Sequence, residues 1–184
     1  MVAPGPADLL NAHDHPMPEG TTPLYLVIDA ARDPAIFDYL LEHQDDLHLE
    51  CLYKGDSAHD LAEVAPYLMA LEAGGEGPAW RFLRQQWGRS CLIVLQGDVD
   101  FTTLRLHLRK LTFARMPSGD MVLFRFYDPR VMRLILPTCD PAQLDRLFGP
   151  VQQIWTEAPQ AGEAELFCWN NGILHHSLIS LTGA

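Results

Sequence analysis

Short apolar runs alternate with amphipathic stretches along most of this 184-residue chain. Residues 24–28, with the sequence LYLVI, form a nearly continuous apolar run, which is typical of a strand buried on both faces. Further strands or extended segments are predicted over residues 47–53, 67–71 and 92–95. Apolar side chains at helical spacing predict helices after Asp33-Pro34, over 79–87 and over 99–110.

Two hairpins and two helix starts are predicted from turn chemistry. Pro117–Asp120 separates segments 111–115 and 121–127, and Asn170-Asn171-Gly172 separates 165–169 from 173–179. Asp128-Pro129 and Asp140-Pro141 each predict a helix start, because the carboxylate accepts free backbone N–H groups and proline suits the first helical position.

Together these elements predict an α/β or α+β fold: a mixed sheet with flanking helices and a short C-terminal hairpin extension. Residues 1–22 are rich in proline and glycine and indicate a flexible arm. We expect the main α/β domain to span 23–150, and the extension with its β-hairpin to span 151–184.

Composition indicates an ordinary globular protein, with 48% hydrophobic and 20% charged residues. No run approaches the roughly 18 apolar residues of a membrane span. The first twenty residues lack a basic start followed by an apolar stretch, so we expect no secretory signal and a cytoplasmic location. The four cysteines form no C-x-x-C pair, which favours reduced thiols over disulfides or a zinc site.

The net charge of −11 is unevenly distributed. Residues 1–76 carry fifteen acids against two bases, a net of −13, whereas residues 99–136 carry seven bases against three acids, a net of +4. Overall acidity opposes nucleic-acid binding, because phosphate backbones attract cationic surfaces. The asymmetry indicates either an internal ionic network or two faces for two partners.

Most candidate chemistry fails on spacing. The sequence has no G-x-S-x-G, H-E-x-x-H, P-loop or G-x-G-x-x-G motif. His175 and His176 are adjacent on a predicted edge strand and would point to opposite faces, so they cannot easily share one ion. We therefore assign no metal and no cofactor.

One group of charged residues remains as a candidate site. Its centre is the run from Leu123 to Val131, and His107 and Arg109 of the preceding predicted helix could join it. Two arginines beside a helix start could bind a phosphate or carboxylate, or they could pair with an aspartate in a buried structural network. The candidate residues are His107, Arg109, Arg125, Tyr127, Asp128 and Arg130.

An ordered series of motifs runs from about Leu24 to Pro150. Its most specific pieces are His107-Leu108-Arg109 and the run from Phe124 to Arg130, FRFYDPR. The others are Leu24–Ala30, Pro66–Leu68, Trp80, Leu104–Leu106, Gly119 and Leu147–Pro150. This series resembles the adaptor–chaperones of the bacterial type VI secretion system, a family long catalogued as a domain of unknown function.

The resemblance implies a non-enzymatic role in the cytoplasm. Such a protein binds an effector toxin, here expected through the N-terminal region of the toxin, and loads it onto the trimeric spike protein of the secretion apparatus. It gives no catalytic residue to carry over. From the charge pattern and the lack of a long apolar run, we also expect no nucleic-acid partner and no membrane partner. Two alternatives stay open: a small-molecule enzyme that uses Arg125, Asp128, Arg130 and His107, and a structural baseplate subunit.

Overall fold

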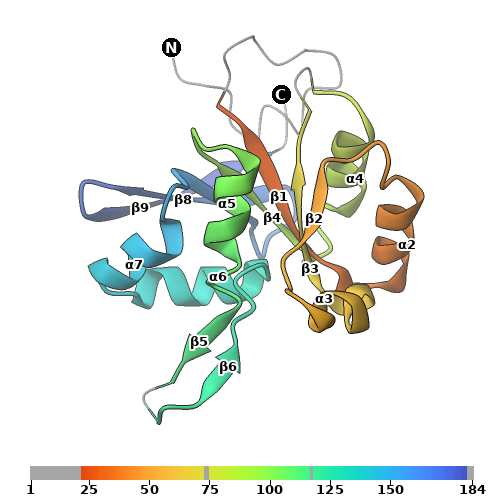
Figure 1. The fold of residues 1–184 in the computed structure, drawn as a ribbon. Helices are drawn as coiled ribbons and strands as arrows, with labels where there is room; N and C mark the ends of the chain where they lie inside the picture. Colours follow the sequence, from red (N-terminus) through yellow and green to blue (C-terminus); the bar gives the residue numbers. More distant parts are fainter. Residues whose placement is uncertain (1–21, 73–74, 117, 182–184) are drawn as a thin grey trace.

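The computed structural model describes residues 22–72, 75–116 and 118–181, and its centre is one seven-stranded sheet (Figure 1). Its order is β2–β3–β1–β4–β7–β8–β9. The strands are β1 (Leu24–Asp29), β2 (Leu49–Cys51), β3 (Pro66–Ala70), β4 (Leu92–Gln96), β7 (Gln153–Glu157), β8 (Glu163–Asn170) and β9 (Ile173–Ser180). A separate two-stranded hairpin consists of β5 (Phe113–Arg115) and β6 (Met121–Leu123).

Helices cover both faces of the sheet (Figure 1). The α-helices are α2 (Pro34–Glu42), α3 (Asp56–Asp60), α4 (Pro78–Gln86), α5 (Phe101–Leu108), α6 (Pro129–Ile135) and α7 (Pro141–Phe148). In the part of the chain that the structure describes, three short 3₁₀ helices accompany them: η1 (Ala30–Arg32), η2 (Ala62–Val64) and η3 (Leu136–Thr138). Among the described helices, none is long and apolar enough to cross a membrane.

The predicted fold class is confirmed, with one difference in strand direction. Every pairing among the described strands is antiparallel, so neighbouring strands of the sheet do not mix directions. The chain runs from β3 through α4 to β4, and these two strands are parallel to each other. They are not neighbours in the sheet, because β1 lies between them and runs antiparallel to both.

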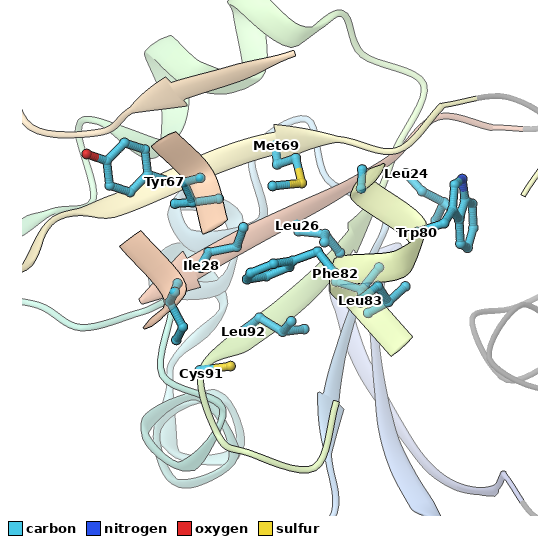
Figure 2. Close-up of a cluster of buried hydrophobic side chains, with 14 of the residues drawn as sticks. Leu24, Leu26, Ile28, Tyr67, Met69, Trp80, Phe82, Leu83, Cys91 and Leu92 are labelled. Carbon is cyan, nitrogen blue, oxygen red and sulfur yellow. The ribbon is translucent and has the colours of Figure 1, made fainter. Parts of the chain in front are cut away.

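Two apolar cores lie on the two faces of β1, whose six residues are all buried. Leu24, Leu26 and Ile28 face α2 and α4, where Trp80 and Phe82 are fully buried (Figure 2). Tyr25 and Val27 face the opposite core, formed with α5, α6 and α7. Adjacent side chains on a strand point to opposite faces, so a continuous apolar run serves both cores.

The C-terminal hairpin is confirmed and belongs to the large sheet. Strands β8 and β9 turn at Asn171 and Gly172, which have φ values of 51° and 75°, a backbone conformation that suits this residue pair. His175 and His176 are exposed on β9, which is an edge strand, as predicted. The division of the chain at residue 150 stays a prediction, and residues 1–21 of the expected arm lie outside the described residues.

The predicted strand over 121–127 is wrong beyond Leu123. Phe124 and Arg125 are irregular, and the chain then turns, with Asp128 N donating to Arg125 O at 3.0 Å. Phe126 and Tyr127 are buried in the core with α5 and α7. Apolar periodicity alone does not distinguish such a buried turn from a strand.

Candidate functional site

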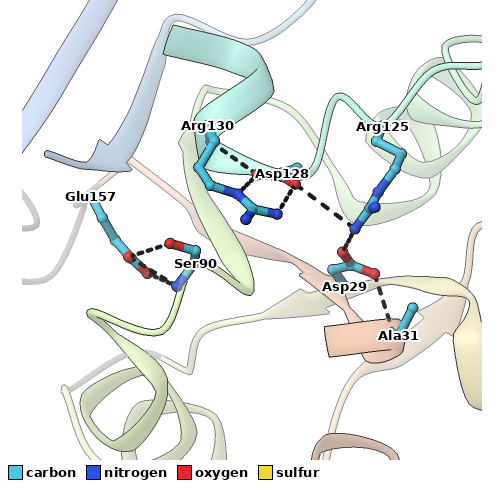
Figure 3. A network of polar contacts seen from close by, with 7 residues as sticks. All are labelled: Asp29, Ala31, Ser90, Arg125, Asp128, Arg130 and Glu157. Atoms are coloured by element: carbon cyan, nitrogen blue, oxygen red, sulfur yellow. Dashed lines mark hydrogen bonds and ion pairs between the residues drawn. The ribbon is translucent and has the colours of Figure 1, made fainter. Parts of the chain in front are cut away.

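The joint between β6 and α6 centres on Asp128, whose side chain is 3% exposed. The carboxylate caps α6 by accepting a hydrogen bond from Arg130 N at 3.0 Å. The Arg130 guanidinium binds the same carboxylate through Nε at 2.9 Å and Nη2 at 2.7 Å (Figure 3). The cap and the bidentate pair hold the first turn of α6 in place, as the Asp-Pro start predicts.

Arg125 connects this joint to the centre of the sheet. Its Nη2 donates to Oδ2 of Asp29, the last residue of β1, and lies 3.8 Å from Oδ2 of Asp128 (Figure 3). The other Asp29 oxygen accepts from Ala31 N at 3.2 Å and caps η1. The Asp29 side chain is 1% exposed and that of Arg125 is 39% exposed, so the anion is buried and the cation reaches the surface.

The pKa values of the two carboxylates in this network are shifted in opposite directions. Burial raises the pKa of Asp29 above its ordinary 3.8, although the hydrogen bond from Arg125 acts in the other direction. Burial acts on Asp128 too, but hydrogen bonds from Arg130 and the two guanidinium charges outweigh it and hold the pKa of Asp128 below 3.8. Asp128 is therefore the more strongly ionised of the pair.

The last turn of α6 makes a second set of polar contacts, with β7 and β8. Arg133 donates to the carbonyl oxygen of Glu157, and its Nε lies 3.6 Å from Oε1 of Glu165. The Glu157 side chain accepts from Ser90 N at 2.9 Å, and burial raises its pKa (Figure 3). Glu165 also lies 2.7 Å from Nε2 of His176. Helix α6 is thus held at both ends by charged groups.

The other predicted site residues lie in separate contacts. His107 Nε2 is 3.1 Å from Leu147 O, and Arg109 Nη2 donates to Cys51 O at 2.7 Å. Tyr127 is buried, which raises its pKa, and it interacts with Tyr53. Within the described ranges, no hydrogen bond or ion pair joins His107 or Arg109 to the Arg125–Asp128–Arg130 group.

Asp29 is a further member of this network that was not among the residues predicted from the sequence. The sequence does contain a signal for it, because Asp29 ends a strand that is apolar on both faces. A charge buried in such a place needs a partner of opposite charge. Both oxygens of Asp29 and both of Asp128 have partners. Within the described part of the chain, no group of three or more His, Cys, Asp or Glu side chains is placed to hold a metal. The contacts fit a structural connection between β1 and α6.

A second feature is the hairpin β5–β6, which projects from the body of the molecule (Figure 1). Its apolar side chains are unusually exposed: Phe113 is 52% exposed and Met121 56%. We call the following five residues the hairpin surface: Phe113, Met116, Met121, Val122 and Leu123. Exposed apolar side chains gathered in this way are typical of interaction sites.

Two hollows flank the hairpin. The first, of about 460 Å³, lies between the hairpin and the segment from α6 to α7, and Val122, Ile135 and Leu147 are among its lining residues. The second, of about 420 Å³, is lined by Leu52 and Leu61. Phe113 and Leu123 line both hollows.

The charged side chains that line these hollows are all basic. Lys110, Arg115 and Arg146 line the first hollow, and Lys54 and Arg109 line the second. None of the five has an ion pair within the described residues. The buried Nε of Arg109 also has no hydrogen-bond partner there.

Comparison with known families decides the classification. The family described as Domain of unknown function (DUF4123) matches residues 24–146. This chain belongs to the DUF4123 family. The matched residues include Asp29, Arg125, Asp128 and Arg130, which we call the ionic joint. They also include the hairpin β5–β6 and most of α7, whereas β7, β8 and β9 lie beyond the match. No curated protein and no solved structure matches the chain.

Proposed function

We propose that this protein is a non-enzymatic adaptor that binds an effector toxin and loads it onto the trimeric spike protein of a type VI secretion system. The observation that carries the proposal is the hairpin surface, which presents apolar side chains on an element that projects from the body. An interface built this way needs no catalytic group. The motif resemblance over about 24–150 and the DUF4123 match over 24–146 cover nearly the same residues.

The ionic joint supports an architectural role for the charged residues. Asp29, Arg125, Asp128 and Arg130 bind one another, and His107 contacts the end of α7 instead. A small-molecule enzyme built on these residues would need His107 beside the arginines, and the contacts of His107 lie elsewhere. We therefore place effector recognition on the surface, and expect the N-terminal region of the effector to be the bound part.

Gene deletion in the producing bacterium tests this proposal. Loss of an adaptor should abolish secretion of one effector while the secretion tube and other effectors continue to leave the cell, and a plasmid copy should restore that effector. Loss of all secretion would instead indicate a baseplate subunit. Unchanged secretion together with a changed small-molecule pool would indicate an enzyme.

Co-purification provides the direct physical test. The tagged full chain should retain the product of a neighbouring toxin gene and the spike protein when the three are expressed together. Mass spectrometry of the eluate identifies them. If neither is retained under low-salt and high-salt washing, the adaptor proposal is wrong.

A further inference from the structure

We infer that the hairpin surface and its two flanking hollows bind an acidic, apolar segment of a partner protein. The inference rests on the proposed adaptor function and names the chemistry of the segment that this site accepts. It follows from two independent properties of the site, its apolar area and the sign of its charge.

The apolar property comes from the register of the hairpin. Phe113 pairs with Leu123 and Arg115 with Met121, and the intervening pair, Ala114 and Val122, points to the opposite face because side chains alternate along a strand. Both faces of β5–β6 therefore present apolar side chains. Phe113 and Leu123 line both hollows, and Ala114 and Val122 line the first, so a partner segment can bury its own apolar side chains in either hollow.

The positive charge of the site comes from lysine and arginine side chains that form no ion pair with a carboxylate of the described residues. The chain has 24 acids and 13 bases, yet every charged residue that lines the two hollows is Lys or Arg. Other arginines nearby have partners, for example Arg105, whose Nη1 lies 2.9 Å from Oε2 of Glu50. The hairpin sequence from Phe113 to Leu123 contains one acid, Asp120, which accepts a hydrogen bond from Ser118 Oγ at 2.7 Å and does not line either hollow.

Charge complementarity selects one occupant for the site. Carboxylates on a partner segment would pair with Lys110, Arg115 and Arg146, which line the first hollow. A basic segment would be repelled there. A second copy of this chain docked hairpin to hairpin would bring the same cations together, which like-charge repulsion opposes.

Fluorescence anisotropy with short labelled peptides tests this inference on the full chain. One peptide alternates Leu and Phe with Asp and Glu, the second replaces the acids by Lys, and the third replaces the apolar residues by Ser. We expect the acidic apolar peptide to bind at least about tenfold more tightly than either of the others, with an affinity that falls as salt increases. Equal binding of the acidic and basic apolar peptides would overturn the inference.

Substitutions then locate the site. Phe113→Ser and Arg115→Glu, both at exposed positions, should each weaken peptide binding at least about fivefold while the melting temperature stays unchanged. The matched controls are Leu134→Ser, an apolar side chain 74% exposed on α6, and Arg89→Glu, an exposed arginine remote in sequence from the hairpin. If the controls weaken binding as much as the hairpin variants, the site is elsewhere and the inference fails.

Three other occupants give distinct results, and each would overturn the inference. A second copy would appear as a concentration-dependent dimer in light scattering that Phe113→Ser abolishes. A lipid surface would appear as flotation with phosphatidylglycerol vesicles, lost in the same variant, without peptide binding. If the chain's own residues 1–21 occupy the site, the acidic apolar peptide should bind tightly to a chain that lacks these residues and weakly to the full chain.

Co-purification of the variants distinguishes a wrong docking site from a wrong adaptor function. If the co-expressed toxin and spike protein are retained equally by wild type, Phe113→Ser and Arg115→Glu, the adaptor proposal stands and the hairpin is not its docking site. If no variant and no wild-type protein retains them, the adaptor proposal itself is wrong.

Discussion

At the scale of single residues, the pair Asp29–Arg125 is asymmetric, because the anion is buried and the cation is partly exposed. Arg125→Met leaves the Asp29 carboxylate buried without its cation. Breaking a buried pair typically costs about 3–5 kcal/mol, and with one partner near water we expect a loss of about 2–4 kcal/mol in the free energy of unfolding. Urea denaturation measures it, with Arg115→Met, an exposed arginine without an ion pair, as the control.

The double variant Arg125→Met/Asp29→Asn should recover part of that loss. Asparagine removes the uncompensated charge, and its side-chain oxygen can still accept from Ala31 N. A double variant as unstable as Arg125→Met alone would show that the pair contributes through packing rather than charge.

The same carboxylates predict opposite responses of stability to pH. The folded-state pKa of Asp29 is raised, so its contribution to the free energy of unfolding falls as pH rises from 3.8 towards the raised value. The folded-state pKa of Asp128 is lowered, so its contribution is present above 3.8 and is lost as pH falls through the lowered value.

Denaturation of two matched variants across the acidic range checks these signs. The free energy of unfolding of Asp29→Asn, relative to that of wild type, should increase as the pH rises from about 2.5 to about 7, because the variant lacks the destabilising ionisation. The relative free energy of unfolding of Asp128→Asn should decrease over the same range. Parallel curves for the two variants would contradict the assigned directions.

At the scale of elements, the end of α7 depends on a close contact between Gly149 and His107. Gly149 is the C-cap, with φ of 51°, and a Cβ added there would lie 2.3 Å from Cε1 of the His107 ring. Gly149→Ala should therefore cost about 2–4 kcal/mol through overpacking and backbone strain.

Thermal or urea denaturation checks this value against a matched glycine. Gly119→Ala is the control, because φ there is 95° but nothing lies within 4 Å of the added Cβ, so only strain remains, about 1 kcal/mol. Adding His107→Ala to Gly149→Ala should relieve part of the loss. Additive effects of the two substitutions would mean that the ring and the glycine do not interact.

At the scale of the whole molecule, the C-terminal strands complete the sheet and both cores. Strand β7 pairs with β4, Trp155 and Ala164 are buried in one core, and Ile154 and Phe167 in the other. A chain ending at residue 150 should therefore be insoluble or lack a cooperative unfolding transition, as circular dichroism would show. A truncated chain that unfolds cooperatively at the wild-type temperature would instead make residues 151–184 an appendage.

Local features of this fold were readable from the sequence, because their causes lie within a few residues. The buried character of β1 follows from an unbroken apolar run, and the starts of α2, α6 and α7 follow from Asp-Pro pairs. The C-terminal hairpin follows from Asn171-Gly172, which tolerates the positive φ values of its turn. The Arg125–Asp128–Arg130 group was predictable because its members are close in sequence.

Tertiary structure alone decided the partners that are distant in sequence. Asp29 lies 96 residues before Arg125, and the two meet only because β1 is an interior strand of the sheet and ends beside the start of α6. His107 and Arg109 left the predicted cluster because their own neighbours, the end of α7 and β2, come from other parts of the chain. Strand direction and the exposure of the hairpin surface likewise depend on how helices cross the sheet, which no local pattern of apolar and polar residues encodes.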